Sequence, residues 1–348
     1  MKNLFDFATK ELSQDAFLKW LFANYNDPQI RDISRSLLAV LGKRGDVDIN
    51  SKNIENVKIL SQYKKIDIAV EFSADGKDYF LVIEDKTNSN QHSEQLNRYR
   101  ETICEEFKNT NTQPLFVFYK TDILSENDDA GIEKANEDKT VPEWKVFNID
   151  HIYSFFKEKT NTPSQILNDY SKYIAGLYKA VHFEDGDDIV NWDKRHWEGY
   201  ALKELSKYNN HKKERYVWIG GYQGRNISLC FQRCLPNDSK DAAVLEIVFR
   251  KKVTGHFRHA FFVDDKSKRV WSINKFKDNK EKTELREKLI NYIKEKKSLG
   301  IVETTRKDAT NTFGKYKESF EITNFEETNK KIKEWIKNFD QMISEFKG

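Results

Sequence analysis

Three ionisable residues in the first third of the chain have the types and spacing needed for metal-dependent hydrolysis. Asp67 is expected inside a strand, and Glu84 and Lys86 end the next apolar strand. Residues two apart in a strand project from the same face, so Glu84 and Lys86 share one side of the sheet. A carboxylate within an apolar strand is costly unless it is paired or bound to a cation. Because two adjacent strands carry such an acid, the sequence predicts that both acids hold one cation.

This inventory matches what the hydrolysis of a phosphodiester bond needs. Mg²⁺ takes hard oxygen ligands and keeps several waters. A bound ion polarises the phosphoryl oxygen and lowers the pKa of a water ligand, and an ammonium beside it stabilises charge in the transition state. Asp67 and Glu84 are the predicted metal ligands and Lys86 the predicted ammonium. The Asp85 side chain points to the other face, but its main-chain carbonyl could still reach the ion. The competing interpretation is a surface ion-pair cluster at a sheet edge.

The elements that must position these residues can be predicted from hydrophobic periodicity. Apolar residues recur at helical spacing over 12–41, with a break at Asp27-Pro28, and a helix is also expected over 91–107. Asp75-Gly76 is a hairpin turn signal. The expected strands are 57–60, 66–72, 79–83, 114–119 and 144–149. The polar stretch 126–140 is expected to be a surface loop or short helix. This order predicts an α/β domain with one mixed sheet between helices.

A second composition begins after the acidic stretch 185–188, which we expect to be a linker, and 160–178 before it is expected to be helical. Strands are expected at 216–219, 227–231, 244–249 and 259–263, with a turn at 223–226 and charged helices over 283–297 and 326–346. A chain of 348 residues is long enough for two cores. We therefore predict a first domain over 1–183, with its core at about 8–150, and an α+β domain with an antiparallel sheet over 190–348.

Charge is distributed unevenly between these two parts. From Arg250 to the C-terminus, 25 Lys and Arg residues stand against 16 Asp and Glu residues, although the whole chain carries only +3. An acidic front suits cation binding and a basic back suits a polyanion. Solvated helix faces explain the basic excess equally well.

Two further motifs surround the acids and the lysine. Gln95 and Tyr99 are four apart and so share a helix face. Upstream, Glu11 precedes the apolar stretch 17–21, Phe-Leu-Lys-Trp-Leu. Together with Asp67, a hairpin and Glu84-Asp85-Lys86, this pattern resembles the PD-(D/E)xK nuclease superfamily, in the branch with a QxxxY helix motif. The resemblance covers about residues 8–150. Ile66 stands where that superfamily has its namesake proline.

The resemblance implies a restriction-endonuclease-like fold and a role for each matching residue. Asp67 and Glu84 match the metal-binding acids, Lys86 the lysine that aligns the attacking water, and Glu11 the first-helix acid that completes the metal site. Gln95 and Tyr99 match residues that contact phosphate or support the site.

The activity that the resemblance implies is that of an endonuclease dependent on Mg²⁺ or Mn²⁺. Double-stranded DNA is the expected substrate, in bacterial restriction or phage defence, although these residues alone do not distinguish DNA from RNA. One alternative is a non-catalytic nucleic-acid-binding or assembly protein on a nuclease-like fold, and another is a protein-binding effector. The second domain could select the substrate, sense a trigger or form a homodimer.

Composition argues against a membrane or secreted protein. No apolar run is long enough to span a bilayer, and the first residues lack a secretory hydrophobic core. The three cysteines, Cys104, Cys230 and Cys234, fit a reducing compartment. Cys230 and Cys234 have no CxxC partner and no nearby histidine, so small buried side chains are favoured over a zinc site. The expected location is the cytoplasm.

Overall fold

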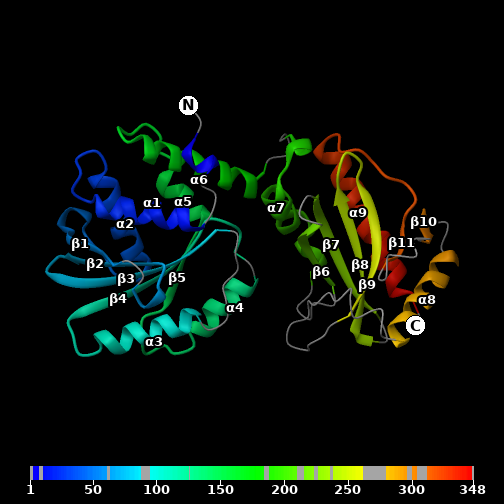
Figure 1. The fold of residues 1–348 in the computed structure, drawn as a ribbon, viewed down its shortest axis with the longest axis horizontal. Coiled ribbons are helices and arrows are strands. Elements are labelled where there is room, and N and C mark those ends of the chain that lie inside the picture. The colour runs from blue at the N-terminus through cyan, green and yellow to red at the C-terminus, as the bar shows by residue number, and fades with distance from the viewer. Residues whose placement is uncertain are drawn as a thin grey trace. The chain divides into compact units, whose positions relative to one another are not determined.

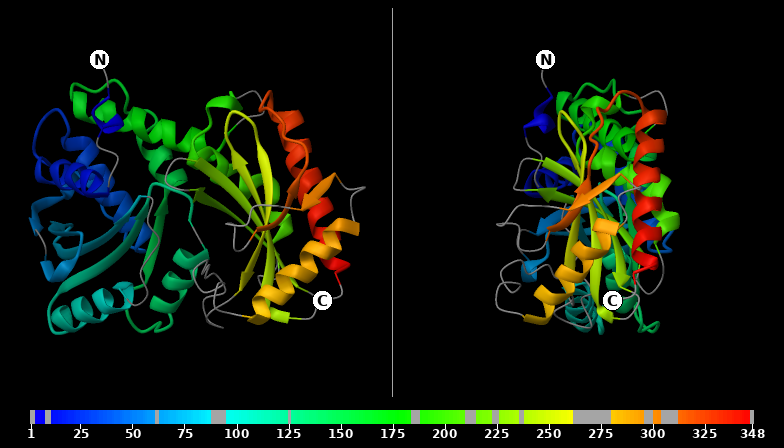
Figure 2. Two further views of the ribbon diagram at one scale, coloured as in Figure 1. Left: turned by 45° about the vertical axis from the view of Figure 1, so that its right-hand side comes forward. Right: turned by 90° about the vertical axis from the view of Figure 1, so that its right-hand side faces the viewer.

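The chain forms two compact units, residues Met1–Val181 and His182–Gly348, each with its own sheet (Figures 1 and 2). The structure is a computed structural model that describes residues 3–7, 11–60, 63–87, 95–124, 126–183, 188–209, 215–222, 226–235, 238–261, 280–295, 300–303 and 312–346. The expected linker 185–188 and the expected turn 223–226 lie almost entirely outside these residues. No helix among them is long and apolar enough to cross a membrane.

Unit 1 is built on a five-stranded mixed sheet with the order β1-β2-β3-β4-β5. The strands are β1 (Glu55–Leu60), β2 (Ile68–Ala74), β3 (Lys77–Lys86), β4 (Thr112–Lys120) and β5 (Trp144–Asn148). The first three pair antiparallel, whereas β3, β4 and β5 are parallel. Lys86 is in register with Lys120, and Lys120 with Asn148, so the three parallel strands end at one level.

Helices cover both faces of this sheet, as the sequence predicts for an α/β domain (Figure 1). They are α1 (Glu11–Ala23), α2 (Arg31–Arg44), α3 (Gln95–Phe107), α4 (Glu126–Ala135), α5 (Ile149–Phe156) and α6 (Gln165–Val181), with short 3₁₀ helices η1 (Leu4–Asp6), η2 (Ser51–Asn53) and η3 (Tyr63–Lys65). The first core packs α1, α2, α5 and α6 on one face, and the second packs α3 and α4 on the other. The stretch 126–140 was expected to be a surface loop or short helix, and its first part forms the helix α4 over Glu126–Ala135.

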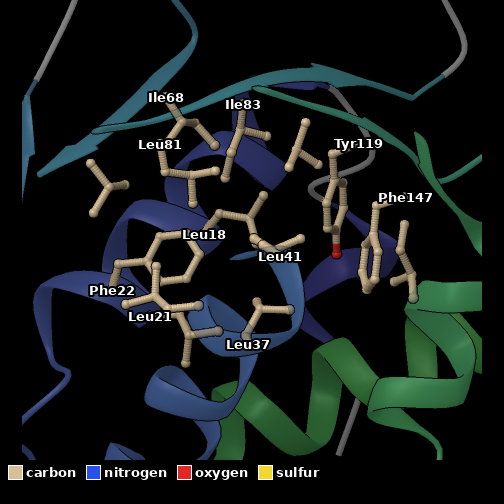
Figure 3. Close-up of a cluster of buried hydrophobic side chains, with 14 of the residues drawn as sticks. Leu18, Leu21, Phe22, Leu37, Leu41, Ile68, Leu81, Ile83, Tyr119 and Phe147 are labelled. Atoms are coloured by element: carbon tan, nitrogen blue, oxygen red, sulfur yellow. The ribbon is translucent and has the colours of Figure 1, made fainter. Parts of the chain in front are cut away.

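Alternation along β3 assigns its side chains to these two cores. Leu81 and Ile83 point into the first core, where α1 and α2 supply Leu18, Leu37 and Leu41 (Figure 3). Phe80 and Val82 point into the second core. Side chains alternate in a strand, so Glu84 and Lys86 continue the second face and Asp85 continues the first. The nearly continuous apolar sequence of β3 therefore reflects burial on both faces.

One expectation about the site's secondary structure is wrong. Asp67 lies in a bend, and β2 begins one residue later at Ile68. Lys64 and Lys65 just before it have left-handed backbones, with φ of 51° and 66°. An extended strand cannot continue through two such residues, so the acid stands at the entrance to the strand rather than within it.

Unit 2 contains a six-stranded antiparallel sheet with the order β10-β11-β9-β8-β7-β6. Its strands are β6 (Arg215–Tyr222), β7 (Asn226–Leu235), β8 (Asp238–Phe249), β9 (Thr254–Phe261), β10 (Ile301–Glu303) and β11 (Thr312–Tyr316). Its described helices are α7 (Lys194–Leu205), α8 (Lys280–Glu295) and α9 (Phe325–Ser344), with the 3₁₀ helices η4 (Ile189–Asn191) and η5 (Ser206–Tyr208). The apolar face of the sheet packs with these three helices in one core. The antiparallel α+β architecture agrees with the sequence prediction, while α7, β10 and β11 were not predicted.

Candidate active site

The β2–β3 hairpin brings together the two acids and the lysine that the sequence singled out. Ile68 pairs with Ile83, and the next residues beyond this pair are Asp67, in the bend just before β2, and Glu84 on β3. The Lys86 Nζ atom lies 2.6 Å from Glu84 Oε1 and 3.8 Å from Asp67 Oδ2. One ammonium that reaches both oxygens puts the two carboxylates within range of a single ion.

Burial differs sharply between the two carboxylates. The Glu84 side chain is fully buried, whereas 26% of the Asp67 side chain is exposed. Asp67 Oδ2 also accepts a hydrogen bond from the main-chain N–H of Asp85, at 3.4 Å. The site is therefore closed behind Glu84 and open to solvent at Asp67.

The electrostatics of Glu84 indicate that the site lacks positive charge. Burial, and then the neighbouring Asp67 carboxylate, raise the pKa of Glu84 to about 8, although Lys86 opposes this shift. Among the described residues, Glu84 Oε2 accepts no hydrogen bond. Two carboxylates this close need a positive charge between them, which a shared proton or a bound cation supplies.

The donor set fits a hard divalent ion that keeps most of its waters. Mg²⁺ is commonly held by one or two carboxylates, with water and phosphate completing the shell. Within the described residues, no three His, Cys, Asp or Glu side chains cluster as a metal site, so Asp67 and Glu84 would be two protein ligands of a partly hydrated ion. The Asp85 main-chain carbonyl, the third predicted ligand, accepts a hydrogen bond from Lys86 Nζ at 3.2 Å.

Glu11 begins α1, but its side chain lies outside the described residues, so its role as a metal ligand stays a prediction. Gln14, one turn further along α1, donates a hydrogen bond to the buried Asp85 carboxylate. This contact places the first turn of α1 at the end of β3 that carries the site, on the face opposite Glu84.

Gln95 and Tyr99 lie on one face of α3, as predicted, and support the turn before Asp67. Gln95 Nε2 donates to the Tyr99 hydroxyl at 3.0 Å, and that hydroxyl donates to the carbonyl of Lys65. A second contact from α3 reinforces the first, because Glu106 accepts hydrogen bonds from Tyr63 and Lys64. The observed geometry favours the supporting role of the motif over direct contact with phosphate.

Sequence reasoning missed a second group of buried polar residues at the same edge. Lys120 is in register with Lys86 and on the same face of the sheet, and its Nζ lies 3.5 Å from the buried Asp128 of α4. Thr121 and Asp122 are also buried. Polar residues that directly follow the apolar run 114–119 were the signal that could have revealed this group.

The comparisons with known proteins agree with this geometry. A family model described as the PD-(D/E)XK nuclease superfamily matches residues 2–199. That match covers more than half of the chain, so the chain belongs to the PD-(D/E)XK nuclease superfamily. A search of curated proteins and a search of solved structures each found no match.

Proposed function

We propose that the chain is a Mg²⁺- or Mn²⁺-dependent endonuclease that hydrolyses phosphodiester bonds in double-stranded DNA. The observation that carries the proposal is the pair of carboxylates that shares one ammonium, with Glu84 buried and its pKa raised to about 8. Strongly perturbed acids beside a specific charged partner are typical of catalytic sites. Membership of a nuclease superfamily supports the same activity.

Each residue has a distinct role in the proposed reaction. Asp67 and Glu84 would hold the divalent ion, with Glu11 as a further ligand. When bound, the ion would polarise the phosphoryl oxygen and acidify a water. Lys86 orients the attacking oxygen and stabilises the negative charge that develops on the phosphate. Gln95 and Tyr99 fix the Lys65 carbonyl and, through it, the bend that carries Asp67.

The test is incubation of the full chain with supercoiled plasmid, linear duplex, single-stranded DNA and RNA, each with Mg²⁺, Mn²⁺ or EDTA. The proposal predicts that plasmid is cut with either metal and remains intact in EDTA, and that the Glu84→Gln variant is inactive. If wild type cuts no nucleic acid under any of these conditions, the non-catalytic alternative replaces the proposal. Cleavage of RNA alone would correct the substrate class.

The proposal also covers the biological setting. We place the activity in the cytoplasm of a bacterium, in restriction or phage defence, because the superfamily is frequent there. The basic C-terminal part would contribute affinity for the substrate or form a homodimer. Phage plating on cells that express wild type or Glu84→Gln tests the defence role, and sedimentation of the purified chain tests the dimer.

A further inference from the structure

A hollow of ≈ 670 Å³ lies at the β5 edge of the unit 1 sheet, where α2 ends. Its wall includes Asn148, the last residue of β5, and His151 in the first turn of α5. Leu124 and Val146, also in the wall, belong to the second core, on the face that carries Glu84 and Lys86. The hollow therefore lies at the same end of the sheet as the candidate active site and extends around the β5 edge, from the face of α2 and α5 to the face that carries Glu84 and Lys86.

Sheet geometry sets the separation between the hollow and the active site. Lys86, Lys120 and Asn148 are in register on three neighbouring parallel strands. Strands lie about 4.8 Å apart, so β5 is about 10 Å from β3. Each strand of DNA carries one phosphate per 3.4 Å of helix axis, so a separation of about 10 Å along that axis corresponds to roughly three nucleotides.

Two of the cations that line the hollow have no counter-ion among the described residues. Lys43 and Arg44 end α2 and are exposed, and within the described residues neither forms an ion pair or a side-chain hydrogen bond. Lys145, by contrast, is neutralised by Asp46 at 3.0 Å and Glu143 at 3.1 Å. Lys43 and Arg44 thus remain available to an anion, although the acids Asp46 and Asp129 also line the hollow.

His151 adds a directed neutral donor to this pair. Its Nδ1 accepts a hydrogen bond from the main-chain N–H of Asn148, at 3.3 Å, in the capping box of α5. That bond leaves the ring proton on Nε2, which can donate to a phosphate oxygen. Burial, with a contribution from Arg44, lowers the pKa of His151, so the neutral form dominates at pH 7. The ring is held in place by stacking on Phe147.

We propose that this hollow binds the phosphodiester backbone of the substrate, roughly three nucleotides from the scissile bond, through Lys43, Arg44 and His151. The inference rests on the proposed function and adds a substrate subsite to it. The subsite would position the strand without reading its sequence, because contacts to phosphate position the nucleic acid and contacts to bases specify it.

The experiment measures the binding of a labelled duplex at several salt concentrations by full-length protein that carries Glu84→Gln. The test variant adds Lys43→Ala and Arg44→Ala. The matched control adds Lys52→Ala and Lys77→Ala, two exposed lysines near the β2–β3 turn, at the opposite end of the sheet. Loss of two phosphate contacts should lower the slope of log K against log salt by about 2 and weaken binding at low salt on the order of tenfold. The control should lower the slope by much less.

Equal slopes for the test variant and the control would overturn the subsite. Single variants, Lys43→Gln and Arg44→Gln, should each lower the slope by about 1, and they provide the same test if the double variant is poorly folded. Because binding is measured without cleavage, this result does not depend on the nuclease activity. If wild type cuts DNA, Lys43→Ala with Arg44→Ala in an otherwise wild-type chain should raise KM and largely keep kcat. If it cuts nothing, the proposed function fails while the salt slopes still decide the subsite.

Discussion

The sheets of the two units each bury charged side chains, but they balance the charges differently. On the unit 2 sheet, Arg258 Nε donates to Glu246 Oε2 at 2.5 Å, so one carboxylate meets one cation. On the unit 1 sheet, Asp67 and Glu84 share the single ammonium of Lys86. The balanced pair is compatible with a purely structural role, whereas the unbalanced group leaves room for another positive charge. In this protein, the ratio of acids to cations therefore distinguishes the candidate metal site from the structural ion pair more clearly than the burial of the side chains does.

The largest expected effect is on catalysis. Asp67→Asn, Glu84→Gln and Lys86→Met should each lower the cleavage rate by about 10²–10³-fold or more, because each removes a metal ligand or a charge that stabilises the transition state. Thermal shift with Mg²⁺ or Mn²⁺ should show that the two acid variants lose stabilisation by metal and that Lys86→Met largely keeps it. Cleavage by Lys86→Met at the wild-type rate would show that Lys86 is misassigned.

The next effect is on the metal-free protein and depends on pH. The pKa of Glu84 is raised from an ordinary value of 4.5 to about 8, so the folded state holds a proton that the unfolded state has lost. Its contribution to stability is fully present below about pH 4.5 and is lost as the pH rises through 8. Glu84→Gln removes this loss, so at pH 9 and without metal the variant should be more stable than wild type by a few kcal/mol.

Urea unfolding of both proteins in EDTA at pH 5, 7 and 9 measures this difference. The gap between them should widen with pH and level off above pH 8. Glu246→Gln in unit 2 is the matched control, because it breaks a balanced pair and should destabilise the protein throughout. A constant gap between wild type and Glu84→Gln would show that Glu84 is not under electrostatic stress.

Breaking the balanced pair should lower the stability of the protein, to the same extent with and without metal. Arg258→Met leaves Glu246 mostly buried without a partner, and this should lower the free energy of unfolding by about 3 kcal/mol. The double variant Arg258→Met with Glu246→Gln should recover part of that loss, because no unpaired charge remains. Denaturant titrations with and without Mg²⁺ give both values, and a metal-dependent loss would contradict the structural interpretation of the pair.

The smallest expected effect concerns the support beneath Asp67. Tyr99→Phe removes the hydrogen bond to the Lys65 carbonyl, which should cost about 1 kcal/mol of stability. If the bond positions the bend, the metal concentration for half-maximal cleavage should also rise, and Asn97→Ala, on an exposed face of α3, should leave it unchanged. An unaltered metal dependence in Tyr99→Phe would limit Tyr99 to a role in stability.

The strongest local signals predicted the core of unit 1 correctly. The apolar run of β3 is a buried central strand, and Asp75-Gly76 forms the hairpin turn with φ of 52° and 74°. These features follow from side-chain burial and from the turn's need for positive φ, both of which can be inferred from short stretches of sequence. The same register brought Asp67 and Glu84 together.

Features that depend on tertiary contacts were not predictable in this way. Lysine does not favour a left-handed backbone, so the residue types of Lys64 and Lys65 do not predict the bend. Hydrogen bonds from Tyr99 and Glu106 of α3 stabilise it. The pairing of Lys120 with Asp128 requires α4 to pack at the end of β4. Strands β10 and β11 have three and five residues and were too short to give a periodic signal.

The hairpin that carries the acids also has a consequence for the order of folding. Asp67 and Asp85 are separated by 18 positions, and a tight turn joins their strands, whereas the Gln14–Asp85 contact behind the site spans 71 positions. Closing a longer loop costs more entropy, and contacts close in sequence form faster. During folding, the hairpin should therefore bring the carboxylates of Asp67 and Glu84 together while water still surrounds them, before α1 packs against β3. A divalent ion present at that stage could bind both carboxylates before the site is buried and would stabilise the hairpin. Refolding in Mg²⁺ should therefore be faster than refolding in EDTA.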